Sequence, residues 1–299
     1  MDIVFSIINV LLFLALAPLF EGLIRKIIAR VQSRQGPPVI QPYRDLLKLL
    51  GKDNMKSGGL AFTIAPMLAF ASILSVIAFL PLGSRVNILA GHADIITMVY
   101  LLTLGGVAVL LGALASRNTY AGIGSSREMI TMIMVEPVLA MSFILGAVKV
   151  KSLMVGSAVA GVFGNGFSIS AVMMLVAYLL ALQAFVGRQP FDIAEAEVEI
   201  LEGTFIEYSG PNYALFKYYL MLKQMFYASL FVVVFIPLGH TPVYALNMLI
   251  QLVCIALVYV VIALIGSTNP RLRIDQAQKY YAVLIAISLA AIGLSVYGL

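Results

Sequence analysis

The stretch VYALNMLIQLVCIALVYVVIALI, residues 243–265, contains 23 residues and no charged side chain. An apolar run of this length is typical of a helix that crosses a bilayer, whose hydrocarbon core is about 30 Å thick and needs about 20 residues. Seven further runs of this kind occur, at residues 3–24, 60–82, 95–116, 129–148, 169–186, 213–236 and 280–297. The sequence therefore predicts an all-α, polytopic membrane protein with eight transmembrane helices.

The composition supports this prediction. Hydrophobic residues make up 62% of the chain and charged residues 11%, whereas about 25% of the residues of a soluble globular protein are charged. We expect the first run to stay in the mature protein, because it lacks the basic leader and the small-residue cleavage site of a signal peptide. No Pro/Ser-rich linker or internal repeat is evident, so we predict a single integral membrane domain over residues 1–299.

Basic residues alternate between the two ends of the predicted spans. Fourteen of the 19 Lys and Arg residues lie in the connections 25–59, 117–128, 187–212 and 266–279, and three lie in the others. By the positive-inside rule these four connections are cytoplasmic, which places the chain in the cell membrane with both termini outside. The net charge of +5 follows from this asymmetry beside anionic lipid headgroups, so no nucleic-acid partner is predicted.

The chain contains few residues that bind redox groups. Its single cysteine, Cys254, lies in the seventh run, and its two histidines, His92 and His240, lie in short connections. A lone cysteine forms neither an internal disulfide nor a cysteine-ligated cluster, and these histidines do not face each other across spans as haem ligands would. We therefore expect no cofactor on this chain and place any redox centre in a partner.

The first long connection contains an amphipathic pattern. Leucines alternate with charged residues after Pro42 and stop at Gly51, which predicts a short helix lying in the membrane interface. Such a helix either seals the edge of the bundle or forms a docking surface for a partner, and the sequence is compatible with both.

The connection GRQPFDIAEAEVEILEGTFIEYSGPN, residues 187–212, holds six of the 14 acidic residues. Asp192 followed by Glu195 matches a capping box, and Gly203 is a suitable helix end, so we predict a helix over residues 193–202. This helix would place Glu195, Glu199 and Glu202 on one face. Neighbouring carboxylates repel one another, and relief comes when one of them holds a proton near neutral pH.

Two interpretations of this acidic row remain open. A row of carboxyl groups that share protons can pass them along, whereas a solvated acidic helix would need no function beyond favourable charges at its N-terminus. The adjacent transmembrane runs and the interleaved apolar residues favour the proton pathway.

Charged residues also occur within the predicted spans. Glu136, in MITMIMVEPVLAMSF, and Lys223 lie inside apolar runs, where a charge costs at least about 2.5 kcal/mol. We expect Glu136 to act as a proton-relay carboxyl reached by way of Glu128, with Lys223 as the nearby cation. A structural ion pair is the alternative. Glu21 is a weaker candidate, because it is close enough to the end of its span to reach water.

Four stretches give the chain a family resemblance: ARVQSRQGPPVIQPYRDLLKLLGK (29–52), GIGSSREMITMIMVEP (122–137), RQPFDIAEAEVEILEGTFIEYSGP (188–211) and STNPRLRIDQ (267–276). They resemble the membrane subunit shared by respiratory complex I, which is an NADH-quinone oxidoreductase, and by energy-converting nickel-iron hydrogenases. YRDLLKLLGK, SREM followed by VEP, and NPRLRID are closer to the hydrogenase branch, which includes formate hydrogenlyase. Related complexes that reduce quinones or sulfur compounds use a similar subunit.

The resemblance implies a subunit of an oxidoreductase complex with no redox centre of its own. It would anchor the soluble electron-transfer arm and link redox chemistry to proton or sodium translocation. The implied partners are a hydrogenase-like large subunit, iron-sulfur subunits and antiporter-like membrane subunits, with the nickel-iron centre and the iron-sulfur clusters in these partners. The implied acidic pathway comprises Glu128, Glu136, Asp192, Glu195, Glu197, Glu199, Glu202 and Glu207, and the implied docking loop comprises Arg30, Arg34, Asp45 and Lys48.

Two other classes of function remain open. A stand-alone ion-coupled transporter would use Glu136 and Lys223 as its coupling pair, and a purely structural anchor would use none of the acids.

Overall fold

The computed structural model describes residues 2–55, 59–80, 82–83, 93–162, 168–236 and 244–298. The side chains of residues 2–6 and of Glu197 lie outside this description. Lys56, Arg85, His92 and His240, which enter the charge and histidine arguments above, also lie outside the described residues.

Eight helices in the described part of the chain are long and apolar enough to cross a membrane. They are α1 (Asp2–Val31), α3 (Leu60–Phe79), α5 (Ile95–Ala115), α6 (Thr119–Val150), α8 (Ile169–Val186), α10 (Gly210–Phe235), α11 (Tyr244–Thr268) and α12 (Ile274–Val296). The shorter elements are α2 (Gln41–Leu50), α7 (Val155–Gly161), α9 (Glu197–Ile200) and the 3-10 helix η1 (Gly203–Phe205). The predicted all-α fold with eight spans is confirmed.

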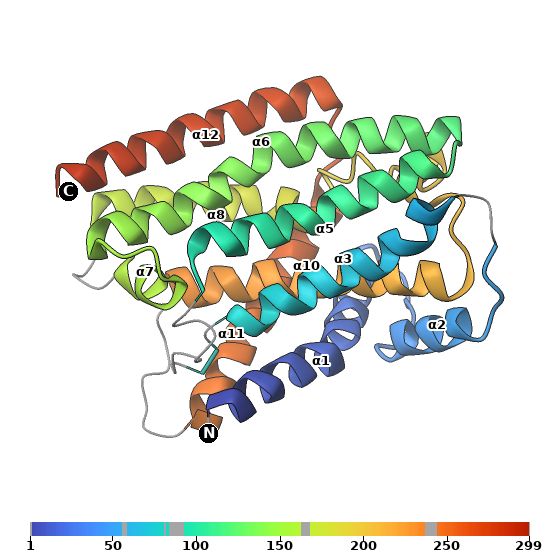
Figure 1. The fold of residues 1–299 in the computed structure, drawn as a ribbon, viewed down its shortest axis with the longest axis horizontal. Coiled ribbons are helices and arrows are strands. Elements are labelled where there is room, and N and C mark those ends of the chain that lie inside the picture. The colour runs from blue at the N-terminus through green and yellow to red at the C-terminus, as the bar shows by residue number, and fades with distance from the viewer. Residues whose placement is uncertain are drawn as a thin grey trace.

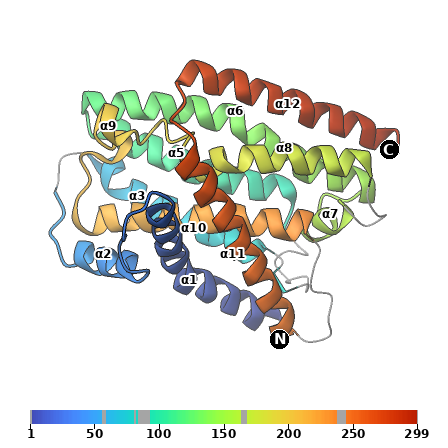
Figure 2. The ribbon, with the colours of Figure 1, turned by 180° about the vertical axis from the view of Figure 1, so that it is seen from behind.

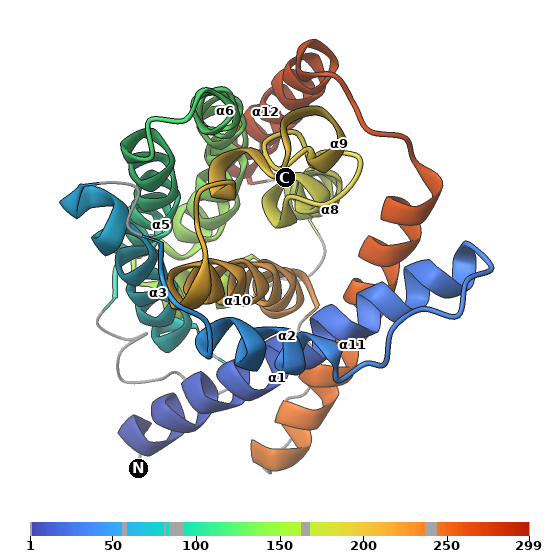
Figure 3. The ribbon, with the colours of Figure 1, turned by 90° about the vertical axis from the view of Figure 1, so that its right-hand side faces the viewer.

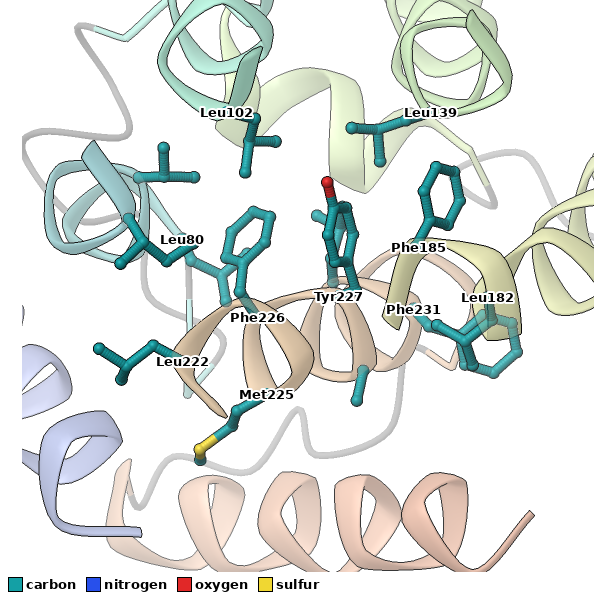
Figure 4. Close-up of a cluster of buried hydrophobic side chains, with 14 of the residues drawn as sticks. Leu80, Leu102, Leu139, Leu182, Phe185, Leu222, Met225, Phe226, Tyr227 and Phe231 are labelled. Atoms are coloured by element: carbon teal, nitrogen blue, oxygen red, sulfur yellow. The ribbon is translucent and has the colours of Figure 1, made fainter. Parts of the chain in front are cut away.

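Helix α10 lies in the centre of the bundle. Viewed from one end, it lies between α1, α3, α8 and α11, and α12 lies further out beyond α6 and α8 (Figure 3). It packs against α1, α2, α3, α8 and α11, and its large side chains fill the space between them. Figure 4 shows Leu222, Met225, Phe226, Tyr227 and Phe231 of α10 within this apolar cluster.

Small residues allow the helices beside α10 to approach closely. A Cβ at Gly105 of α5 would lie 2.6 Å from Ser72 Oγ of α3 and 2.9 Å from Tyr219 Oη of α10. Because lipid is as apolar as the helix surfaces, close packing of this kind is a main source of helix association in membranes.

The predicted amphipathic helix is present as α2. Pro42 occupies its first turn, where proline costs no hydrogen bond, and Gly51 follows its last residue. Pro42 and Leu46 are buried, and the helix packs against α1 and α10, while Leu47 and Leu50 are exposed. Its position in the membrane interface stays a prediction.

Several helices extend beyond the apolar runs that revealed them. Helix α1 continues past Ile24 to Val31, and α6 begins at Thr119 rather than at Met129. Asn118 caps α6, because its side-chain oxygen accepts a hydrogen bond of 2.8 Å from the backbone N–H of Tyr120. Most of the connection predicted at residues 117–128 is therefore helical.

The prediction of a helix over residues 193–202 is wrong. Regular helix is confined to α9, four residues long, and Leu201 and Glu202 have φ angles of 52° and 66°, in the left-handed region that ends a helix. Asp192 does not cap this helix, because its carboxylate binds Arg271. Glu195, Glu199 and Glu202 consequently do not share a helix face.

Candidate functional site

The residues predicted to carry function gather at one end of the bundle. The segment between α8 and α10, residues 188–209, is called the acidic segment below. It includes α9, which lies at the same end as α2 and the turn between α5 and α6 (Figures 1 and 2). The C-terminus lies at the opposite end (Figure 1).

Most acids of the acidic segment have a partner from another element. Asp192 Oδ2 lies 3.0 Å from Arg271 Nη2, and Glu199 Oε2 lies 2.7 Å from Arg127 Nη1. Glu202 lies 3.9 Å from Lys217 Nζ and accepts a hydrogen bond of 2.7 Å from Tyr213 Oη. Glu207 accepts one of 2.7 Å from Asn118 Nδ2. These contacts hold the acidic segment against α6, α10 and the α11–α12 connection.

Glu195 is the exception among the acids of this segment whose side chains are described. It is half-buried and has no ion-pair or hydrogen-bond partner in the described part of the chain. Burial raises the pKa of Glu195 to about 7, with Lys217 acting in the opposite direction and Asp192 adding to the rise. A carboxyl group with this pKa exchanges a proton near neutral pH, as a proton relay requires.

A cavity of about 60 Å³ connects Glu195 to the two acids of α6. It is lined by Glu195, Glu128, Glu136, Thr131 and Lys223, among others. A water molecule needs about 10–15 Å³ of such space and two to four polar partners, so this smaller cavity has the size and lining to hold ordered water.

The ion pair inside the smaller cavity joins Lys223, which was expected as the cation near Glu136, to Glu128. Lys223 Nζ lies 3.7 Å from Glu128 Oε1. Glu136 lines the same cavity but has no ion-pair partner among the described residues. Lys223 therefore neutralises Glu128, and Glu136 keeps a carboxyl group that faces the cavity without a bound cation.

A second, larger cavity of about 590 Å³ is also lined by Glu195. Helices α1, α2 and α10 and the acidic segment enclose it, and its lining carries both signs of charge. The charged side chains are Glu21, Arg25, Asp45, Lys48, Lys52, Arg188, Asp192, Glu195, Glu202 and Lys217. Glu195 and Asp192 line both cavities. Asp192 is bound to Arg271, so of these two acids Glu195 is the one without a partner in the described part of the chain.

Sequence reasoning underestimated Glu21 and missed Arg188. Glu21 is buried, with 4% of its side chain exposed, and pairs with Arg25 at 3.1 Å and with Arg188. The position of Glu21 near the end of an apolar run suggested access to water, but its side chain is buried and bound by Arg188 of the acidic segment. An arginine beside a long acidic stretch was the available signal for Arg188.

The four predicted docking residues differ in their exposure and contacts. Arg30, Arg34 and Lys48 are exposed, whereas the carboxylate of Asp45 lies 3.3 Å from Arg25 and 2.9 Å from Gln41. Asp45 is therefore engaged within the chain. The side chain of Glu197 lies outside the described residues.

Comparison with known proteins identifies the family. The family model described as NADH dehydrogenase matches residues 3–296. The chain is 35% identical to hydrogenase-4 component C of Escherichia coli, over 97% of this chain and 94% of that protein, and 31% identical to formate hydrogenlyase subunit 4 of the same organism, over 97% and 100%. It is 32% identical to a subunit of the NADH-quinone oxidoreductase of Bacillus cytotoxicus, over 98% and 93%.

A solved structure shares the fold. A chain of the membrane-bound sulfane sulfur reductase, an archaeal respiratory membrane complex, superposes with a TM-score of 0.85 at 26% identity, over 99% of this chain and 100% of that one. The relatives are subunits of multisubunit complexes, and the resemblance seen in the four sequence stretches is confirmed. The chain is a multi-pass membrane protein that belongs to the NADH dehydrogenase family.

Proposed function

We propose that this chain is the membrane anchor and coupling subunit of an energy-converting redox complex. It docks the soluble electron-transfer arm at α2 and the acidic segment and links electron transfer to proton or sodium translocation. The single observation that carries this proposal is Glu195, a carboxyl group that has no partner among the described residues and lines two polar cavities. An acid placed there passes a proton between the larger cavity and Glu136.

The proposed route is short. A proton enters the larger cavity from the cytoplasm, binds Glu195, and reaches Glu136 through the smaller cavity, whose lining suits ordered water. Glu128 and Lys223 form the charged wall of this route and stay paired. The other acids of the acidic segment hold its shape through their ion pairs, so the pathway needs fewer acids than the row expected from the sequence.

The hydrogenase branch is the proposed setting. Hydrogenase-4 and formate hydrogenlyase subunits align over nearly the whole chain, and the motifs quoted above favour them. We infer that the partners are a hydrogenase-like large subunit, iron-sulfur subunits and antiporter-like membrane subunits, and that these partners hold the nickel-iron centre and the iron-sulfur clusters. The chain would lie in the cell membrane with both termini outside.

A sulfur- or quinone-reducing complex is a second candidate, because the sulfane sulfur reductase chain and the quinone oxidoreductase subunits match over similar lengths. The cysteine content of the co-purifying large subunit separates these settings. Paired CxxC motifs that can hold nickel and iron support a hydrogenase, and their absence supports a reductase. A stand-alone transporter would instead move ions when reconstituted alone, without partners.

The test of the function uses the complete complex in vesicles. Glu195→Gln keeps the size of the side chain but removes the exchangeable proton, so it should assemble normally and lose most of the ion gradient formed per electron transferred. Glu199→Gln is the matched control, since Glu199 is an exposed acid of the same segment bound to Arg127. An unchanged gradient in Glu195→Gln contradicts the relay.

A further inference from the structure

A continuous set of polar contacts joins the amphipathic helix α2 to the centre of the bundle. On α2, Asp45 accepts a hydrogen bond of 2.9 Å from Gln41 Nε2 and lies 3.3 Å from Arg25 Nη1 of α1. Arg25 Nε lies 3.1 Å from Glu21 Oε1. The other oxygen of Glu21 binds Arg188.

Arg188 completes this set of contacts at α10. Its Nη2 donates a hydrogen bond of 3.3 Å to Gln224 Oε1 as well as binding Glu21. The carboxylate of Glu21 therefore lies between two guanidinium groups, one from its own helix and one from the acidic segment. A guanidinium presents several donors in a fixed plane, so this arrangement defines the position of Arg188 more tightly than a lysine would.

Arg188 interacts with acids on two sides. Burial disfavours its charge, but the carboxylates of Glu21, and then of Glu195 and Asp192, raise the pKa of Arg188 above its ordinary value. Arg188 and Glu195 line the same cavity of about 590 Å³. Arg188 thus interacts with two acids: it binds Glu21 directly, and it acts on Glu195 through electrostatic attraction without a direct contact.

The other charged groups around Glu195 are held by different partners. Lys217 of α10 pairs with Glu202, Glu128 of α6 pairs with Lys223, and Asp192 of the acidic segment pairs with Arg271. Arg188 differs from these groups because its partner Glu21 is tied, through Arg25 and Asp45, to the exposed helix α2.

We propose that Arg188 is a positioning residue for the proton step at Glu195, and that the Asp45–Arg25–Glu21 contacts determine how much of its charge reaches Glu195. This inference rests on the proposed function of Glu195. A partner that docks on α2 and draws Asp45 away from Arg25 lets Arg25 bind Glu21 more fully. Arg188 is then released toward Glu195, which favours loss of its proton.

The test is the pH profile of redox-driven ion transport by the complex in vesicles. The rate of transport should decrease at high pH, where Glu195 loses its proton; this decrease is the alkaline limb of the profile. In Glu21→Gln, Arg188 keeps its charge and loses its main counter-charge, so this alkaline limb should move to lower pH by about one unit, the size expected for a nearby charge. In Glu21→Gln/Arg188→Gln both charges are absent, and the limb should return toward that of the parent complex.

A milder variant covers the case in which Glu21→Gln does not assemble. Asp45 lies at the half-exposed end of the contacts, so Asp45→Asn should assemble and move the limb in the same direction by a smaller amount. Asp275→Asn is the matched control, since it removes one acid from an exposed pair with Arg273 and should leave the limb in place.

The outcomes separate this inference from the proposed function. Reduced assembly with an unmoved limb in Glu21→Gln and Asp45→Asn means that the contacts are structural, and it overturns the role of Arg188. If Glu195→Gln transports normally, the proposed function itself fails. If Glu195→Gln is inactive and the limb does not respond to Glu21→Gln, the proposed function stands and this inference alone is wrong.

Discussion

Glu128 of α6 and Lys223 of α10 form an ion pair of 3.7 Å on the wall of the smaller cavity, and Glu136 lines the same cavity with no ion pair to any residue that the structure describes. The two acids of α6 therefore have different roles. Glu128 compensates the half-buried Lys223, and Glu136 is available to carry a proton.

Replacing Glu136 tests this division. Glu136→Gln should leave the complex assembled and electron transfer measurable while it strongly reduces the ion gradient, because the amide keeps the shape and loses the proton. Glu136→Asp should retain part of the gradient, since the acid survives with a shorter reach. Both quantities are measured together in vesicles.

The contrasting variant is Glu128→Gln. It leaves Lys223, whose side chain is 21% exposed, without its partner. Because the pair is partly buried, the cost should lie between the roughly 0–1 kcal/mol of an exposed pair and the roughly 3–5 kcal/mol of a fully buried one. We therefore expect less assembled complex in Glu128→Gln, measured by the yield of the purified complex. If Glu136→Gln forms a normal gradient, the relay does not pass through Glu136.

The pKa of Glu195 predicts a pH dependence of stability. Burial raises this pKa to about 7, above the unfolded value, so between these two values the folded state binds more protons than the unfolded state. Stability should fall as pH rises from about 4.5 to 7, by at most about 3 kcal/mol, and level off above that. Glu195→Gln should remove this dependence. The Tm of the variant minus the Tm of the parent chain, measured in detergent, should therefore increase as pH rises. A Tm difference that is constant with pH contradicts the raised pKa.

Glu199 predicts the opposite dependence. A hydrogen bond from Arg127 lowers the pKa of Glu199, so the stabilisation is present above the unfolded pKa and is lost as pH falls through the folded one. The pair is partly exposed, and such pairs contribute about 0–1 kcal/mol. Arg127→Gln should therefore change Tm slightly near pH 7 and not at all near pH 3, as measured by thermal unfolding in detergent.

Arg34 tests the docking loop. Its guanidinium is exposed and binds Gln32 of the same loop. If a carboxylate of a soluble subunit binds it, Arg34→Ala should lower the amount of assembled complex, and Arg34→Lys should restore little of it, because lysine lacks the planar fork. Equal assembly in both variants and the parent chain removes Arg34 from the docking surface.

Site-directed crosslinking identifies what covers this end of the bundle. Cys254 is the only cysteine of the chain and is buried, so new cysteines can be labelled selectively. Lys52→Cys, beside α2, and Val198→Cys, on α9 with 92% of the residue exposed, should both capture a peripheral iron-sulfur or large subunit. Capture of membrane chains alone argues against docking at this end.

The apolar runs were sufficient to predict the spans, and local caps explain where the prediction was accurate. Helix α8 has the predicted bounds, because Ser168 caps its start and Gly187, with φ of 65°, ends it. Helix α6 was predicted too short, because hydropathy reports the thickness of the apolar layer and not the length of the helix. Asn118 carried the missing signal.

The sequence predicted which acidic residues form the site, but it did not predict how they are arranged or paired. The capping-box pattern at Asp192 suggested a local helix, but Arg271, 79 positions away, binds that carboxylate. Contacts over such distances leave no periodicity in the sequence. For the same reason, the sequence did not distinguish Glu195 from its paired neighbours, nor assign Lys223 to Glu128 rather than to Glu136.

The enclosed position of α10 has a consequence for biogenesis. This helix carries Lys217 and Lys223 and has a mean hydropathy of 1.4, against 3.0 for α11, so it enters a bilayer less readily as an isolated segment. The helices α1, α3 and α8 that surround it are synthesised earlier. Together with α6, which is also synthesised earlier, they present Glu21 of α1 and Glu128 of α6, so α10 can leave the translocon into protein rather than into lipid. Early helices that associate incorrectly would leave the two lysines facing hydrocarbon, and membrane quality control would then remove the chain before any partner subunit arrived.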